Sequence, residues 1–153
     1  MPRLIKNGVI TDSDWLPVNP DQQAQGHILS LEQWQALENK QGSAVQLEPG
    51  DGVTTLLNHL DEIALVAVNF PVFTDGRGFS YGRELRERGF EGELRAVGEF
   101  IRDQANYLHR CGFDALQFTD EHQLETALSL LQPFSDSYQA DIRQPLPLFR
   151  RRG

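Results

Sequence analysis

The sequence predicts a single α/β domain in which alternating βα units form a mostly parallel sheet flanked by helices. An unbroken apolar run at residues 63–68 is typical of a strand that is buried on both faces. Two capping boxes, Ser30 with Gln33 and Asp120 with Gln123, mark helix starts on either side of this strand. A doubly wound sheet and a partial βα barrel both satisfy this alternation, and the strand order stays open.

The first part of the chain, residues 1–29, is expected to be an extended segment. Residues 4–6 and 8–10 are short pieces that could pair with each other. Turn-forming residues follow at 12–14 and at 19–21. The alternation of strands and helices therefore begins only at residue 30.

The rest of the chain alternates between short strands and helices. Strands are predicted at residues 44–47, 63–68, 94–97 and 115–118. Helices are predicted at residues 80–88 and 99–110, and others begin at residues 30, 51 and 120. Residues 139–153 are polar, with two prolines and three consecutive arginines, and are expected to form a loosely ordered tail.

The composition is ordinary for one globular domain spanning residues 1–153, and the net charge is −8. That charge argues against general binding of nucleic acid or of an anionic membrane. No apolar run approaches the roughly 20 residues that a membrane span needs, and the N-terminus does not read as a signal peptide. With a single cysteine, no internal disulfide can form, so a cytoplasmic location is expected.

The loop after the 63–68 strand is the strongest candidate site. In open α/β folds such a loop faces the ligand crevice, and its glycines would let a bound group approach the backbone. Its backbone N–H groups and an arginine could hold a small oxyanion or a nucleotide phosphate. The candidate ligand-binding residues are Asp75, Gly76, Arg77, Gly78 and Ser80, with Arg83 from the helix that follows.

A structural alternative exists for the same loop. Asp75 could pair with Arg77 in a tight turn and have no ligand at all. The spacing Gly76-Arg77-Gly78 lacks the third glycine of a dinucleotide fingerprint, and no P-loop lysine follows. The cofactor is therefore unknown, and no catalytic residue is identified.

Cys111 is the second candidate, as a redox residue. Arg110 and His109 lie beside it, and positive charge favours a thiolate. Its place at the end of a helix and on the apolar face favours a buried structural cysteine instead. No metal site is predicted, because the four histidines are scattered along the chain.

Several motifs occur in order between residues 70 and 114. They are Phe70-Pro71-Val72-Phe73-Thr74-Asp75-Gly76-Arg77-Gly78-Phe79-Ser80, Arg83-Glu84-Leu85-Arg86, Gly92-Glu93-Leu94-Arg95-Ala96, Asp103-Gln104 and Arg110-Cys111-Gly112-Phe113-Asp114. This set closely resembles an uncharacterised bacterial family, a domain of unknown function. Members of that family are typically encoded beside sulfite reductase and adenylyl-sulfate reductase, and are often described as probable oxidoreductases involved in sulfite reduction.

The resemblance implies a role in assimilatory sulfite reduction but no particular reaction. The first hypothesis is an accessory protein that docks on sulfite reductase subunits and recognises an anion or an acidic surface. The second is a free-standing small oxidoreductase or transferase with an external cofactor. The third is a non-catalytic scaffold. Whether the chain is an enzyme is left open.

Overall fold

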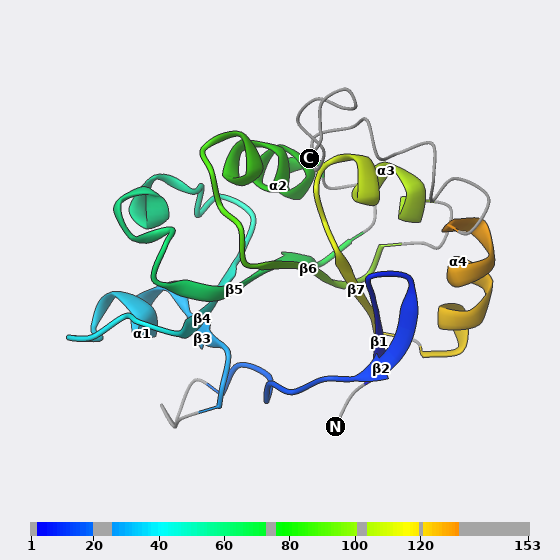
Figure 1. Ribbon diagram of the computed structural model, residues 1–153, viewed down its shortest axis with the longest axis horizontal. Helices are drawn as coiled ribbons and strands as arrows, with labels where there is room; N and C mark the ends of the chain where they lie inside the picture. Colours follow the sequence, from blue (N-terminus) through cyan, green and yellow to red (C-terminus); the bar gives the residue numbers. More distant parts are fainter. Residues whose placement is uncertain (1–2, 20–25, 73–75, 101–103, 120, 132–153) are drawn as a thin grey trace.

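The computed structural model describes residues 3–19, 26–72, 76–100, 104–119 and 121–131. Within these residues, seven strands form one sheet in the order β2-β1-β7-β6-β5-β4-β3 (Figure 1). The strands are β1 (Arg3–Lys6), β2 (Val9–Asp12), β3 (Leu29–Ser30), β4 (Ser43–Leu47), β5 (Ile63–Phe70), β6 (Glu93–Gly98) and β7 (Ala115–Phe118). The helices are α1 (Leu31–Gln35), α2 (Arg77–Glu87), α3 (Ala105–Arg110) and α4 (Leu124–Leu131), with 3-10 turns η1 (Thr54–His59) and η3 (Glu121–Gln123).

Strands β3 to β7 are parallel, and each pairs with the next one along the chain. The order never reverses, so right-handed crossovers carry the connecting helices to one face of the sheet. Figure 1 shows α2 and α3 on one side of β5, β6 and β7, and residues 13–19 on the other side. A doubly wound sheet needs a reversal of strand order, so the observed arrangement is the partial βα barrel.

Both faces of the central strands are buried, as the apolar run at residues 63–68 predicts. The outer face of β5 contributes Val66 and Val68 to the core under the helices. The inner face contributes Leu65 and Ala67 to a smaller cluster with Ile28, Ala44 and Val97, against which Trp15 and Val18 pack. The N-terminal segment therefore covers apolar side chains on the inner face of the sheet, as the helices do on the outer face.

The extended N-terminal segment predicted for residues 1–29 is partly a β-hairpin. Strands β1 and β2 pair antiparallel, and β1 also pairs antiparallel with β7. Asn7 and Gly8 join them with positive φ angles of 53° and 81°. Two positive φ values in succession fit the two-residue turn whose twist matches a hairpin.

Helix boundaries differ from the predictions in three places. Helix α2 begins at Arg77, three residues before the predicted start, with Gly76 as its N-cap. Residues 54–59 form a 3-10 turn, because Asp51 does not cap a helix; its carboxylate accepts a hydrogen bond from the Glu48 N–H at 2.7 Å. Glu99 is not helical, because its N–H donates to the Phe70 carbonyl at 2.7 Å and prolongs the sheet.

The other local predictions have different outcomes. The capping box of Ser30 and Gln33 is confirmed, with reciprocal hydrogen bonds of 3.0 Å and 3.2 Å. Asp120 and the tail at residues 139–153 lie outside the described residues. In the part of the chain that the structure describes, no helix has the length and hydropathy to cross a membrane.

Candidate functional site

Hydrogen-bonded polar side chains gather where β4 and β5 end. Asn69 donates from Nδ2 to Glu48 Oε1 at 2.7 Å, and Gln46 donates from Nε2 to Glu48 Oε2 at 2.8 Å. Each oxygen of one carboxylate therefore holds one carboxamide. The carboxyl edge of a parallel sheet is where α/β folds bind their ligands.

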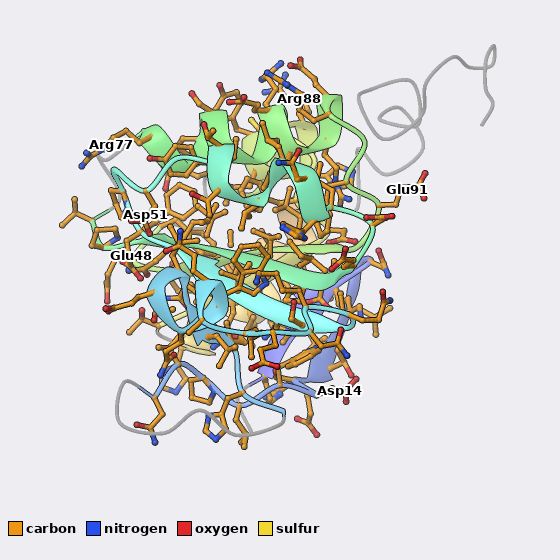
Figure 2. All side chains as sticks on the ribbon, turned by 90° about the vertical axis from the view of Figure 1, so that its left-hand side faces the viewer. Asp14, Glu48, Asp51, Arg77, Arg88 and Glu91 are labelled. Carbon is orange, nitrogen blue, oxygen red and sulfur yellow. The ribbon has the colours of Figure 1, made fainter. Side chains whose placement is uncertain are left out.

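The turn after β4 meets the start of α2 at this edge. The Gly50 N–H donates to the Tyr81 hydroxyl at 2.8 Å. Gly50 has a φ of +97°, and a Cβ on it would lie 3.7 Å from Arg77 Nη1. The Arg77 guanidinium therefore lies beside the turn that carries Glu48 and Asp51. Figure 2 shows these three labelled residues toward one end of the molecule and Glu91 at the opposite end.

The N-terminus of α2 is suited to negative charge. Its N-cap residue is Gly76, which has no side chain to accept from the first N–H groups. The first N–H groups of a helix have no partner within the helix, and the macrodipole adds partial positive charge there. The exposed Arg77 begins the same turn. Against this, the turn beside Arg77 carries the negative charges of Glu48 and Asp51, which oppose the attraction for an anion.

Gly78 has a packing role that the sequence did not reveal. It is buried, and a Cβ on it would lie 2.6 Å from the Phe70 ring and 2.9 Å from Val68 Cγ1. Such distances are shorter than Cβ atoms tolerate. The glycine lets α2 pack directly on β5, whereas Gly76 has no atom within 4 Å of such a Cβ.

Of the other predicted ligand residues that the structure describes, Arg83 lies away from Arg77. Asp75 lies outside the described residues, and Ser80 is exposed within α2. Arg83 is six positions after Arg77, about 240° further around the helix at 100° per residue. Its Nη2 atom lies 3.7 Å from Cys111 Sγ, and this hydrogen bond raises the pKa of Arg83 above its ordinary value, with a smaller contribution from Tyr107.

Cys111 is fully buried at the C-terminus of α3. Its thiol lies in the main core cluster on the outer face of the sheet. The exposed Arg83 covers it from α2. An oxidant could reach the sulfur only after local opening of this packing, as expected for a structural cysteine.

Seven of the chain's twelve arginines lie between Arg77 and Arg110, and two of these, Arg86 and Arg95, serve the fold. Arg86 donates to the carbonyl oxygens of Phe90, Gly92 and Gly112, each at 2.9 Å. Arg95 is 2% exposed and lies on the inner face of β6. The described arginines of this stretch are therefore divided between different surfaces, with Arg77 at the carboxyl edge beside the β4 turn.

The inner face holds a feature that sequence reasoning missed. A cavity of about 180 Å³ lies there, lined by Trp15, Pro17, Ile28, Gln46, Asn69, Val97, Gly98 and Gln117. Its three carboxamides, Gln46, Asn69 and Gln117, are the next-to-last residues of β4, β5 and β7, at strand positions that face inward. Their signal is a polar side chain at alternate positions of otherwise apolar strands. Among the described residues, no cluster of three or more His, Cys, Asp or Glu side chains could hold a metal ion.

Comparison with known proteins identifies the family. A family model described as a bacterial protein of unknown function (DUF934) matches residues 44–149. The chain belongs to DUF934. The predicted resemblance to an uncharacterised bacterial family is thereby confirmed. No curated protein and no solved structure gives a significant match.

The DUF934 match begins inside β4 and includes the start of α2 and the carboxamides of the inner-face cavity. Arg77 and the turn with Glu48 lie within it, as do the three carboxamides of the cavity. Trp15, Pro17 and Ile28, which form the opposite wall, precede the match. The DUF934 segment therefore supplies the polar groups of the cavity, and the preceding chain supplies apolar ones.

Proposed function

We propose that this protein is an accessory component of assimilatory sulfite reduction that recognises a small oxyanion, or an acidic group of a partner, at the start of α2. The observation that carries the anion site is Arg77, exposed in the first turn of an 11-residue helix whose N-cap residue is a glycine. The pathway rests on the resemblance of the motifs between residues 70 and 114.

The energetics suit a weak, selective site. A helix N-terminus contributes about 0.3–1 kcal/mol to an exposed anion. A charge-assisted hydrogen bond from a guanidinium contributes about 1.5–3 kcal/mol. Glu48 and Asp51 oppose part of this gain, and the net charge of −8 repels polyanions at longer range. A compact oxyanion or a single acidic side chain therefore fits better than a nucleic acid.

A thermal-shift panel tests the anion site. The ligands are sulfite, sulfate, phosphate, adenylyl sulfate, and nicotinamide and flavin nucleotides. A ligand at about 100 times its dissociation constant adds about 2.7 kcal/mol. For a domain of this size, that corresponds to a shift on the order of 5–10 °C. One oxyanion is expected to stabilise the wild type and to have no effect on Arg77→Ala.

Arg88→Ala is the matched control. Arg88 is also exposed, lies at the other end of α2, and makes a 3.6 Å ion pair with Glu84 (Figure 2). The Arg88→Ala substitution removes one positive charge, as Arg77→Ala does, but leaves the N-terminus of α2 unchanged. If Arg88→Ala abolishes the shift as fully as Arg77→Ala does, the effect is general electrostatics and the site is wrong. Absence of any shift across the panel would also reject a small-anion site.

Co-purification tests the docking role. Sulfite reductase subunits are expected to be retained by the wild type and by Arg88→Ala, and to be lost with Arg77→Ala. Equal retention by all three proteins would exclude docking through this edge. An enzyme in its own right would change sulfite-dependent oxidation of an electron donor in trace amounts, whereas an accessory protein is required in amounts equal to its partner.

A further inference from the structure

The cavity on the inner face lies at the level where β5, β6 and β7 end. Asn69, Val97 and Gln117 are register partners across these three strands, so their side chains form one row. Gln46 reaches the same space from β4. In βα barrels, ligands bind at this carboxyl end. Here the N-terminal segment closes the opposite side, with Trp15 as its largest side chain.

Hydrogen bonds fix the orientation of two carboxamides. The NH2 groups of Gln46 and Asn69 are both directed to Glu48, at 2.8 Å and 2.7 Å. Each amide therefore keeps its carbonyl oxygen for another partner. Asn69 Oδ1 lies against the backbone of Gly98, where an added Cβ would be 2.7 Å away. Gln46 and Asn69 thus present two acceptors to the cavity.

The third carboxamide has the opposite orientation. Gln117 Oε1 accepts a hydrogen bond from Arg95 Nη1 at 3.1 Å. The buried Arg95 is held in turn by Ser13 Oγ at 3.0 Å and by Glu93 Oε2 at 2.8 Å. With its oxygen engaged, Gln117 has its NH2 group available as a donor. Two acceptors and one donor are therefore prearranged on one wall.

The size and charge of the cavity restrict its occupant. An apolar protein cavity of about 150 Å³ binds benzene. The volume of about 180 Å³ therefore accommodates one six-membered ring with a small substituent. None of the described residues that line it carries a charged side chain, and Trp15, Pro17, Ile28 and Val97 supply apolar surface. A neutral planar ring fits this environment better than an anion does.

We infer that this cavity binds a neutral heterocycle with an amide edge, in which N–H donors stand beside a carbonyl oxygen. The N–H groups would donate to the oxygens of Gln46 and Asn69, and the carbonyl would accept from Gln117. Pyridine carboxamides and lactam nucleobases share this edge. The site is distinct from the start of α2, because its side chains lie on the opposite face of the sheet, and it does not depend on the anion proposal.

The matched ligands are nicotinamide and nicotinate, which share a ring and differ in an amide against a carboxylate. Uracil tests the nucleobase source of the same edge. Binding is followed by the ¹H–¹⁵N signals of the two indole groups in the chain. Trp15 lines the cavity, whereas Trp34 is buried and donates to Ser43 Oγ at 2.9 Å outside it. Saturable movement of the Trp15 signal alone is expected, with nicotinate at least tenfold weaker than the amide ligand.

Variants locate the contacts. Gln46→Met and Gln117→Met remove one amide each at similar volume and are expected to weaken binding about tenfold. Gln41→Met, on an exposed turn that does not line this cavity, and Arg77→Ala are expected to bind as the wild type does. Gln117→Met also removes the partner of Arg95; if it fails to fold, Gln46→Met decides alone.

Three results would overturn the inference. The first is equal affinity for nicotinamide and nicotinate. The second is unchanged affinity of Gln46→Met for the amide ligand. The third is an unchanged chemical shift of the Trp15 indole signal with every amide ligand. Loss of oxyanion binding in Arg77→Ala, with amide binding intact, would show that the two sites are separate. Tighter binding of uracil than of nicotinamide would identify a nucleobase as the ligand class of the cavity. Tighter binding of nicotinamide would identify a pyridine carboxamide.

Discussion

Gly78 in the first turn of α2 lies directly against the ring of Phe70, the last residue of β5. The contact is so close that a Cβ at position 78 would stand 2.6 Å from two ring carbons. Phe70 is itself buried and packs against the rings of Phe79, Phe100 and Phe113. The start of α2, and with it Arg77, is therefore positioned by a glycine on an aromatic ring.

We expect Gly78→Ala to destabilise the fold. Alanine favours a helix by up to about 1 kcal/mol, but overpacking a core costs about 1–3 kcal/mol, so the clash decides the sign. Gly76→Ala is the control, because its added Cβ meets nothing within 4 Å. Urea unfolding monitored by circular dichroism measures both. If the two variants are equally stable, the packing role of Gly78 is wrong.

Arg95→Met is expected to lower the free energy of unfolding by about 3–5 kcal/mol, because it leaves the Glu93 carboxylate largely buried without its closest partner. Lys6 also pairs with Glu93, at 3.0 Å, but its side chain is 39% exposed. Lys6→Met should therefore cost at most about 1 kcal/mol. Chemical denaturation of the two variants makes the comparison, and equal losses would contradict the difference in burial.

Arg86→Lys should be clearly destabilising although it keeps the charge. The guanidinium serves three backbone carbonyls at once, and an ammonium cannot reproduce that planar geometry. Loss of even one charge-assisted hydrogen bond costs about 1.5–3 kcal/mol. Arg88→Lys, at an exposed site, should change stability by less than about 0.5 kcal/mol. Melting curves in which both variants match the wild type would reject this assignment.

The thiol of Cys111 should react with a maleimide far more slowly in the folded protein than in urea, because it has no exposed surface. Its reaction is expected to require local opening. Mass spectrometry of timed samples gives both rates. Rapid modification under native conditions would restore Cys111 as a candidate redox residue.

The features that were predicted correctly are those with local causes. The strand at residues 115–118 matches β7, and the Ser30 capping box needs only residues three positions apart. The start of α2 was placed too late because Gly76 and Gly78 look like loop residues in the sequence. The reason for Gly78 is its contact with Phe70, which exists only after β5 and α2 pack together.

The cavity could not be predicted for a related reason. Gln46, Asn69 and Gln117 come from three strands, and their convergence depends on strand order and register. Local sequence patterns determine neither the strand order nor the register. Arg77 and Arg83 are close in the sequence, and their spacing suggests one shared ligand site. The helix places them on different surfaces instead.

The hydrogen bond between Ser13 and Arg95 fastens the N-terminal segment to the inner face of the sheet. That segment supplies the apolar wall of the cavity, while β4, β5 and β7 supply the polar one. The apolar wall and the hydrogen-bonding wall of the cavity therefore come from separate stretches of the chain. A substitution at Pro17, which lines the cavity but is not part of the inner-face core, is consequently expected to reshape the apolar wall and to leave the three carboxamides in place.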